Sequence, residues 1–233
     1  MISVVIPLFN EQGSLEPLQE RLYKVMKELG EYEIIYVDDG STDSSLEVLK
    51  KLKGAYPEVR IISLSRNHGQ STALIAGFKI CRGDWIVTLD ADLQNPPEEI
   101  GRLFEHREKF DFITGIRKER KDSSVKKTSS CIAGFFRRLI LDDATQDVGC
   151  SLRAFRREVI ECIPLFKNFH RFFPFFAAQA GFRVEQIPVA HQARTVGKSK
   201  YGTLKRLREG ICDLIGASWL KKRLMLYEIK YQC

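Results

Sequence analysis

The sequence predicts an α/β fold: a Rossmann-like, mixed, mostly parallel sheet with helices on both faces. Short runs rich in Val, Ile and aromatic residues recur along the first half of the chain, and helix-period segments separate them. The runs are apolar throughout instead of alternating with polar residues, which is typical of parallel strands that are buried on both faces. Strands that alternate with helices in this way indicate a sheet with helices on both sides.

Five runs are expected to be strands, at residues 2–7, 33–38, 59–64, 84–89 and 111–116. Between the first two, apolar residues repeat at helical spacing from Leu15 to Leu29 and stop at Gly30. Further helices are predicted after Ser44 and after Asn95. Beyond the fifth strand the pattern is less regular, and it predicts a helix at 132–141 and strands at 151–156 and 184–188.

Polar residues follow directly on each of the five strands. They are Pro7-Leu8-Phe9-Asn10-Glu11, Asp38-Asp39-Gly40-Ser41, Ser65-Arg66-Asn67, Asp90-Ala91-Asp92 and Arg117. Parallel sheets bind ligands at the carboxyl ends of their strands, so these residues are expected to converge on one rim. The first turn lacks G-x-G-x-x-G, and no GxxxxGK[ST] segment occurs, which disfavours a dinucleotide oxidoreductase and a P-loop enzyme.

The pair Asp90 and Asp92 suggests a metal site. Carboxylates two residues apart on an extended segment point to the same side, and together they can hold a hard divalent cation. Gln94 keeps the same spacing and offers a third oxygen. A Mg²⁺ or Mn²⁺ ion there would bind a diphosphate and neutralise charge on a leaving group. An isolated D-x-D is common by chance, and only its place beside the other strand ends favours a site.

Six segments together resemble a known family: VVIPLFNE, YVDDGSTDSSLEVL, SLSRNHGQSTALIAGF, GDWIVTLDADLQNPPEEI, QDVGCSLRAFRREV and GKSKYG. They are similar to the family-two inverting glycosyltransferases of the GT-A fold, in particular to polyprenyl-phosphate glycosyltransferases such as dolichyl-phosphate mannose synthases and bacterial undecaprenyl-phosphate sugar transferases. The likeness extends over residues 1–203 in continuous order. The DADLQNPPEE and GKSKYG segments make it specific, whereas VDDGS belongs to the wider superfamily.

For the nucleoside of a nucleotide-sugar donor, the resemblance implies contacts from Pro7, Phe9 and Glu11. It makes Asp39 the acceptor of a hydrogen bond from the base and gives Asp38 a supporting position in the same pocket.

For the phosphates and the reaction, the resemblance implies a further set of residues. The donor diphosphate is expected to meet Arg66, Asp90, Ala91, Asp92 and Arg117, and Mg²⁺ or Mn²⁺ to bind Asp90, Asp92 and Gln94. The lipid phosphate of the acceptor is expected at Arg194, Ser199 and Lys200. The catalytic residues that follow from it are Asp92, Arg117 and Asp147.

The role of Asp147 depends on the acceptor. A lipid phosphate is already anionic at neutral pH, so it needs cations that bring it beside another anion more than it needs a base. Arg194, Lys198 and Lys200 supply such cations, and Asp147 would then orient groups. The alternative is a saccharide or protein hydroxyl as acceptor, for which Asp147 would be an obligatory base.

The positive charge lies mostly in the C-terminal tail. Residues 194–233 hold ten Lys and Arg against three acids, an excess equal to the whole net charge of +7. Apolar residues recur there at helical spacing, namely Leu204, Leu207, Ile211, Leu214, Ile215 and Trp219. This pattern predicts either a helix in a bilayer interface or an ordinary amphipathic helix packed on the domain. We therefore expect a catalytic domain at 1–200 and an amphipathic, basic, membrane-proximal tail at 201–233.

Two rivals of another class are a nucleic-acid-binding protein and a non-catalytic membrane-binding module. The tail's aromatics do not interleave with its cations as a base-stacking platform requires, and every motif position holds a chemically competent residue. No signal-peptide pattern or long apolar run occurs, so we expect a cytoplasmic enzyme, peripheral on the cytosolic face of a membrane. The expected partners are a nucleotide sugar, a polyprenyl phosphate, the membrane surface and, as a further candidate, a separate membrane-anchoring subunit, but no nucleic acid.

Overall fold

The computed structural model describes residues 1–117, 134, 136–192 and 203–224, with side chains described throughout except at 203–209. The described strands form one seven-stranded sheet in the order β3-β2-β1-β4-β6-β5-β7. Their bounds are β1 Ile2–Leu8, β2 Tyr32–Asp38, β3 Val59–Ser63, β4 Trp85–Thr88, β5 Phe112–Arg117, β6 Arg153–Arg156 and β7 Val184–Val189. All neighbours are parallel except β6, which runs antiparallel to both β4 and β5. The predicted mixed, mostly parallel sheet is confirmed.

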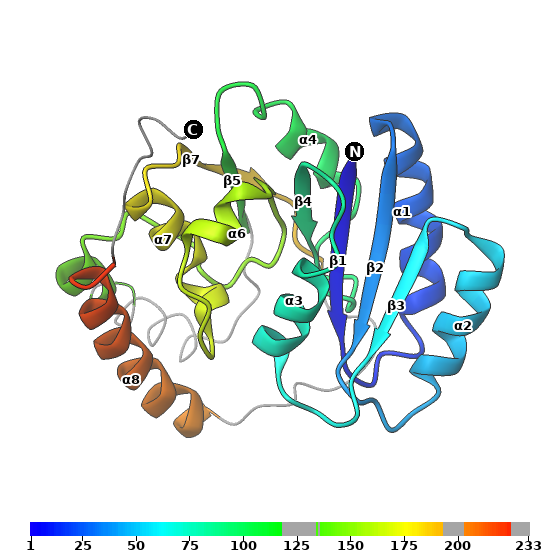
Figure 1. Ribbon diagram of the computed structural model, residues 1–233, viewed down its shortest axis with the longest axis horizontal. Helices are drawn as coiled ribbons and strands as arrows, with labels where there is room; N and C mark the ends of the chain where they lie inside the picture. Colours follow the sequence, from blue (N-terminus) through cyan, green and yellow to red (C-terminus); the bar gives the residue numbers. More distant parts are fainter. Residues whose placement is uncertain (118–133, 135, 193–202, 225–233) are drawn as a thin grey trace, which may run out of the picture.

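Helices cover both faces of the sheet (Figure 1). One face carries α1 Leu15–Leu29, α2 Ser45–Ala55 and α4 Glu99–Phe104. The other carries α3 Gln70–Phe78, α6 Glu158–Cys162, the 3₁₀ turn η1 Phe169–Arg171 and α7 Phe173–Gln179. Every residue of β1 is buried because both of its faces are covered, which explains why its sequence is apolar without alternation.

The close packing of α3 on the sheet sets one wall of the rim. A Cβ added at Gly77 would lie 2.4 Å from Cγ1 of Val5, so only glycine lets this helix come so near to β1. The helix begins at Gln70, directly after the loop that follows β3. Its first turn therefore lies at the carboxyl edge of the strands, where the polar residues were expected.

The tail contains α8, Thr203–Lys221, on the face that also carries α7 (Figure 1). The side of α8 that bears Ala217 packs into the aromatic core, whereas Ile211, Ile215 and Trp219 are 54%, 64% and 59% exposed. The sequence left a packed helix and an interfacial helix as alternatives, and this helix has a packed side together with an exposed apolar side. No helix in the described part of the chain is long and apolar enough to cross a membrane.

A second short helix lies beside the end of α8. Residues 134 and 136–141, the described part of the helix predicted at 132–141, are helical. The ammonium of Lys221 donates a hydrogen bond to the carbonyl oxygen of Leu141 at 2.7 Å, which joins the two helices. Phe136, Leu139 and Ile140 are exposed on this short helix.

Candidate active site

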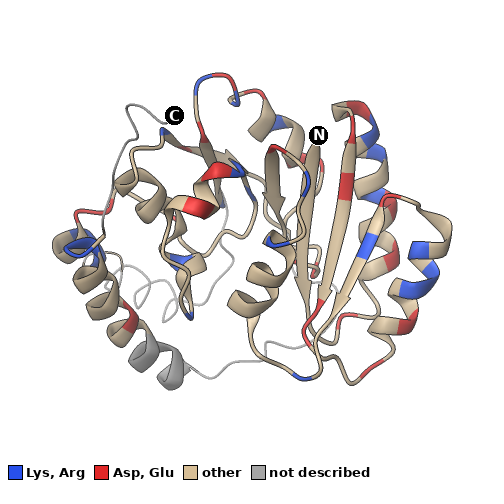
Figure 2. Ribbon diagram, viewed as in Figure 1, with Lys and Arg blue, Asp and Glu red and all other residues tan. Residues whose placement is uncertain are grey.

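The carboxyl ends of the parallel strands meet at one edge of the sheet, as the sequence predicts (Figure 1). In Figure 2, acidic segments gather at this edge, at the lower end of β2 and in the loops around it. The first part of the edge is built from the loops after β1 and β2. Asn10 has φ 55°, and its side chain and backbone bond the second loop: its N–H donates to Ser41 Oγ at 2.8 Å, and its Oδ1 accepts from Thr42 N–H at 2.7 Å.

The predicted nucleoside residues lie in these two loops. Pro7 is buried in β1 opposite Val37, Phe9 is half-buried, and Glu11 is buried with its N–H bonded to Ser45 Oγ. The hydrogen bonds between the loops hold these residues in one rigid unit. Asp38, the last residue of β2, and Asp39, which begins the second loop, complete the set of residues expected at the nucleoside.

Asp38 and Asp39 organise the turn that follows β2. Asp38 accepts hydrogen bonds from Ser41 N–H and Ser63 Oγ, and its supporting position in a nucleoside pocket stays a prediction. Each carboxylate oxygen of Asp39 accepts one backbone N–H, from His68 and Gly69, both at 2.8 Å. Each carboxylate oxygen has a second lone pair that can accept a further hydrogen bond. The expected contact between Asp39 and a base stays a prediction.

The same turn needs glycine at position 40. Gly40 has φ +68°, and a Cβ added there would lie 2.4 Å from the backbone carbon of Arg66. The loop after β3 thus lies directly on the turn after β2. Arg66, predicted to lie near the diphosphate, is exposed on this loop.

The acidic pair lies where β4 ends. β4 stops at Thr88, residues 91–92 form a turn, and Leu93 has φ 61°, a left-handed conformation that is uncommon for a bulky residue. The argument that Asp90, Asp92 and Gln94 share one side of an extended segment is therefore wrong, because the chain turns after Asp90. The turn itself brings the two carboxylates close enough that Asp92 raises the pKa of Asp90.

The surroundings of Asp90 disfavour its ionised form. Burial, and next the neighbouring Asp92 carboxylate, raise the pKa of Asp90 to about 6. Gln70, the first residue of α3, donates a hydrogen bond from Nε2 to Asp90 Oδ1 at 2.8 Å. Sequence reasoning missed Gln70, although it lies within the SLSRNHGQSTALIAGF segment that carries the resemblance.

The carboxylates of the acidic turn suit a Mg²⁺ or Mn²⁺ ion that is also bound by substrate phosphates. The described residues contain no group of three or more His, Cys, Asp or Glu that would form a closed metal site. Mg²⁺ is usually held by one or two carboxylates, with phosphate oxygens and water completing its coordination. Asp90 and Asp92 supply two such carboxylates. Gln94 donates its N–H to Asp92 Oδ1 at 3.2 Å, and its predicted role as a ligand is not tested by this contact.

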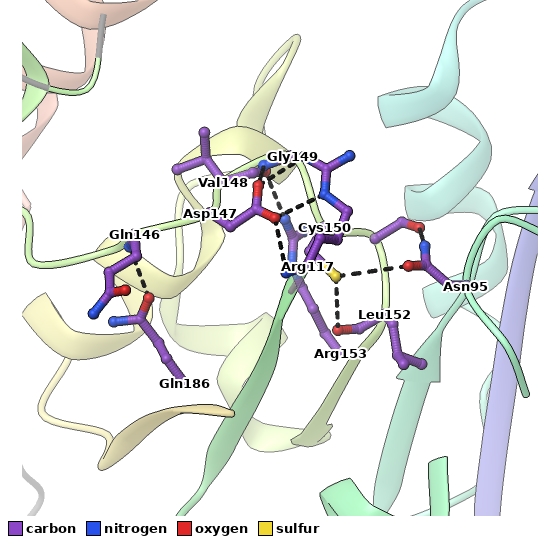
Figure 3. A network of polar contacts seen from close by, with 11 residues as sticks. Asn95, Arg117, Gln146, Asp147, Val148, Gly149, Cys150, Leu152, Arg153 and Gln186 are labelled. Atoms are coloured by element: carbon purple, nitrogen blue, oxygen red, sulfur yellow. Dashed lines mark hydrogen bonds and ion pairs between the residues drawn. The ribbon is translucent and has the colours of Figure 1, made fainter. Parts of the chain in front are cut away.

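Arg117 and Asp147 form a bidentate ion pair at the end of β5 (Figure 3). The guanidinium Nε and Nη2 donate to the two carboxylate oxygens, each at 2.7 Å. The backbone N–H groups of Arg117 and Gly149 also donate to this carboxylate. A Cβ at Gly149 would lie 2.6 Å from Arg117 Nη2, so the guanidinium lies tightly against the turn that carries Asp147. Asp147 orients Arg117 in this structure.

Arg153 is a cation of the site that sequence reasoning missed. It lies on β6, between β4 and β5, and only 3% of it is exposed. It interacts electrostatically with Asp90, Asp147 and Arg117. The antiparallel insertion of β6 brings it there, and no local sequence pattern predicts such an insertion.

The predicted acceptor residues Arg194, Ser199 and Lys200 lie outside the described residues. The chain that leads to them is placed at the acidic turn, because Gln192 N–H donates to Gln94 O at 2.8 Å. His170, near Arg153, is held by Ser71, whose Oγ lies 3.0 Å from Nδ1. Burial lowers the pKa of His170 to about 3, so its ring is neutral.

A comparison with protein families decides the membership of this chain. The model described as glycosyl transferase family 2 matches residues 3–164, which include β1 to β6 and every described candidate residue. This chain belongs to glycosyl transferase family 2. The family assigned from the sequence motifs is thereby confirmed. The matched residues include the strand ends and loops that form the candidate site.

Two curated relatives of this family-2 chain share one name. Proteins from Pseudomonas fluorescens and Edwardsiella ictaluri, each named undecaprenyl-phosphate 4-deoxy-4-formamido-L-arabinose transferase, are both 41% identical to it, over 218 and 208 residues. These alignments cover 92% and 88% of this chain but 64% of each relative. The chain thus spans slightly less than two thirds of the length of the curated relatives it matches.

Solved structures support the fold. Glucosyl-3-phosphoglycerate synthase from Mycobacterium tuberculosis, in complex with Mn²⁺, UDP and phosphoglyceric acid, has a TM-score of 0.70 at 19% identity, covering 98% of this chain and 80% of the other. A Pyrobaculum calidifontis mannosyltransferase in complex with GDP-mannose and Mn²⁺ has a TM-score of 0.65 at 17% identity, covering 98% of this chain and 65% of the other. At these identities the likeness concerns the fold.

Proposed function

We propose that this family-2 chain transfers a sugar from a nucleotide sugar to a polyprenyl phosphate, with inversion at the anomeric carbon. The observation that carries the proposal is the match to undecaprenyl-phosphate sugar transferases at 41% identity, which covers 92% of this chain. The Mn²⁺, UDP and GDP-mannose of structures with the same fold support a nucleotide-sugar donor and a divalent cation.

In this proposal the donor lies along the edge of the sheet. Its nucleoside occupies the unit formed by the loops after β1 and β2, and its diphosphate lies at the turn after β4. Asp90 and Asp92 would hold Mg²⁺ or Mn²⁺, which supplies positive charge to the diphosphate as it leaves. Gln70 donates a hydrogen bond to Oδ1 of Asp90, so this carboxylate is oriented before the ion binds.

The acceptor attacks from the side of Arg117. A phosphate monoester is an anion that acts as a nucleophile without losing a proton, and it must approach a second anion, the donor diphosphate. Arg117 supplies a cation in a fixed orientation, because Asp147 and the turn at Gly149 hold it. The acceptor phosphate oxygen forms the new bond to the anomeric carbon, and the bond to the nucleoside diphosphate breaks.

The ion pair also favours a phosphate acceptor over a hydroxyl acceptor. A general base must accept a proton from the attacking group, yet both carboxylate oxygens of Asp147 already accept hydrogen bonds from Arg117. We therefore assign Asp147 the positioning of Arg117. An acceptor with a neutral hydroxyl would need this carboxylate released from its partner.

We also propose that the protein acts as a peripheral protein on the cytosolic face of a membrane. The residues Phe136, Leu139, Ile140, Ile211, Ile215 and Trp219 are exposed on the two helices joined by Lys221, and we infer that they form one apolar patch. Lys222 and Arg223 follow at the end of α8, and the guanidinium of Arg223 lies 5.6 Å from the ring centre of Trp219. Apolar side chains flanked by cations are typical of helices that lie in an anionic bilayer interface. A separate anchoring subunit remains a candidate partner.

The function is tested by incubating the protein with Mn²⁺, a panel of radiolabelled UDP- and GDP-sugars, and a short polyprenyl phosphate. We expect label from one donor to move into organic solvent, and omission of the polyprenyl phosphate to abolish the transfer. The same panel with saccharide acceptors serves as the control. Transfer to a saccharide at an equal or higher rate would contradict a polyprenyl-phosphate acceptor.

We predict that the protein binds vesicles of anionic phospholipid and that this binding weakens as salt rises. Exposed charges are screened within about 10 Å at 0.1 M salt, whereas insertion of the apolar side chains is not. In a vesicle sedimentation assay, the double variant Ile215→Ser, Trp219→Ser should bind at least about tenfold more weakly, since each buried apolar side chain contributes roughly 1.5–3 kcal/mol. Leu165→Ser, at an exposed apolar residue outside the patch, is the matched control. If the wild type, the double variant and the control bind vesicles equally, the exposed side of α8 does not contact the membrane. In that case α8 is only a helix packed on the domain.

A further inference from the structure

Arg153 is a buried cation that forms no ion pair with any residue the structure describes. Burial lowers the pKa of its guanidinium, and the carboxylates of Asp90 and Asp147 offset this through space without forming an ion pair. No carboxylate in the described part of the chain forms an ion pair with it, its Nε has no hydrogen-bond partner, and Nη2 donates to the carbonyl oxygen of Val148 at 3.1 Å. A guanidinium has five N–H donors, and the Nε donor of Arg153 is buried without a partner among the described residues.

Such an arrangement is costly in a folded protein. Taking an ion out of water costs several kcal/mol when no paired charge offsets it, and native proteins pair nearly all of their buried charges. The ring of Phe173, 6.0 Å from the guanidinium carbon, gives only a weak cation–π contact at that distance. Thr114, the residue opposite Arg153 on β5, also has a buried hydroxyl without a partner in the described structure. Two unsatisfied polar groups on adjacent strands indicate that a ligand completes the site.

The location of Arg153 identifies the chemistry of that ligand. Its side chain runs from β6 to the turn at 147–150, beside Asp147 and Arg117 (Figure 3). The charges that it feels are those of Asp90, Asp147 and Arg117, on the strands that end at the candidate site. Arg117 is engaged by Asp147, whereas the Nε of Arg153 has no partner in the described part of the chain. A phosphate oxygen is the anion that this site is proposed to hold, and guanidinium groups bind phosphate through paired N–H donors.

We propose that Arg153 forms a phosphate subsite of the active site, in which its guanidinium binds an oxygen of a substrate phosphate. The proposal rests on the proposed function for the identity of that substrate, which is either the diphosphate of the donor or the phosphate of the acceptor. The subsite lies next to the turn that carries Asp147, where Arg153 Nη2 donates to the carbonyl oxygen of Val148. Arg117 and Arg153 would then meet the phosphates from two strands, and the apo protein carries an unpaired charge that substrate neutralises.

The test compares Arg153→Met, Arg153→Lys and, as the matched control, Arg156→Met. Arg156 lies three residues further along β6 and is paired with Asp111, away from the candidate site. Binding of pyrophosphate, UDP, GDP and farnesyl phosphate is measured by calorimetry in the presence of Mn²⁺, and the unfolding temperature is measured without ligand. A loss with UDP or GDP identifies the donor diphosphate as the source of the phosphate, and a loss with farnesyl phosphate identifies the acceptor.

We expect Arg153→Met to bind at least one of these ligands about ten- to a hundredfold more weakly, the range for a charge-assisted contact to phosphate, and Arg153→Lys to lie between. Its unfolding temperature should equal or exceed that of the wild type, because a buried unpaired charge has been removed. A purely structural arginine would behave in the opposite way, with lowered stability and unchanged binding. Arg156→Met should keep all four affinities.

Unchanged affinity of folded Arg153→Met for all four ligands overturns the proposal. If Arg153→Met does not fold, Arg153→Lys decides, and affinities within twofold of the wild type overturn it as well. The subsite and the proposed function can fail separately. Weakened pyrophosphate binding in the Arg153 variants supports the subsite even if the wild type transfers no sugar to a polyprenyl phosphate.

Discussion

Replacing Asp92 by Ala is expected to lower the rate of sugar transfer by at least about a hundredfold, which corresponds to a loss of a few kcal/mol of charge stabilisation. Asp90 and Asp92 are the two carboxylates at the turn after β4, and they interact so closely that Asp92 raises the pKa of Asp90. Two acids held together in this way favour a divalent cation between them and the diphosphate. Removal of one leaves a single carboxylate, which binds Mn²⁺ much more weakly.

Transfer kinetics with saturating Mn²⁺, together with Mn²⁺ titration by calorimetry, check this prediction. Asp84→Ala is the matched control, because Asp84 precedes the same strand at its opposite end and its side chain is 77% exposed. We expect the control to transfer sugar at the wild-type rate. If Asp92→Ala keeps full activity in excess chelator, the metal site is wrong.

Replacing Arg117 by Met is expected to lower catalytic efficiency with a polyprenyl phosphate by roughly ten- to a hundredfold, the range of a charge-assisted contact to phosphate. Asp147→Asn should cost less than this, because asparagine keeps one acceptor oxygen toward the guanidinium and the cation remains. The order of the two effects separates the acceptors. With a neutral hydroxyl acceptor, Asp147→Asn should nearly abolish transfer, since no base would accept the proton.

The comparison uses steady-state kinetics over a range of acceptor concentrations, with nucleotide binding measured separately. Arg183→Met is the matched control. Arg183 forms a bidentate contact with Asp111, the residue just before β5, and so lies at the amino end of the strand whose carboxyl end carries Arg117. It should leave transfer unchanged. An inactive Asp147→Asn protein beside a fully active Arg117→Met protein would count against a phosphate acceptor and against our assignment of Asp147.

The sequence by itself determined the strands and the edge at which the candidate residues gather. All seven predicted strands are confirmed, each within about two residues of its expected bounds, because continuous apolar runs bounded by polar residues have few alternatives in a buried sheet. The motif residues after β1, β2, β4 and β5 lie together because parallel strands end at the same edge. The helix of the tail was also predicted, since its apolar spacing is local.

Only the tertiary structure decided how the candidate residues are paired. β6 inserts antiparallel between β4 and β5, which brings Arg153 near Asp90, a residue far from it in sequence that follows β4. The turn after Asp90 overrides strand alternation, and Arg117 pairs with Asp147, the carboxylate that would be the base for a hydroxyl acceptor. Strand order and side-chain pairing depend on contacts between distant segments, whose energies no local pattern contains. For the same reason, the sequence predicted a basic and acidic rim, and the fold determined which cation pairs with which acid.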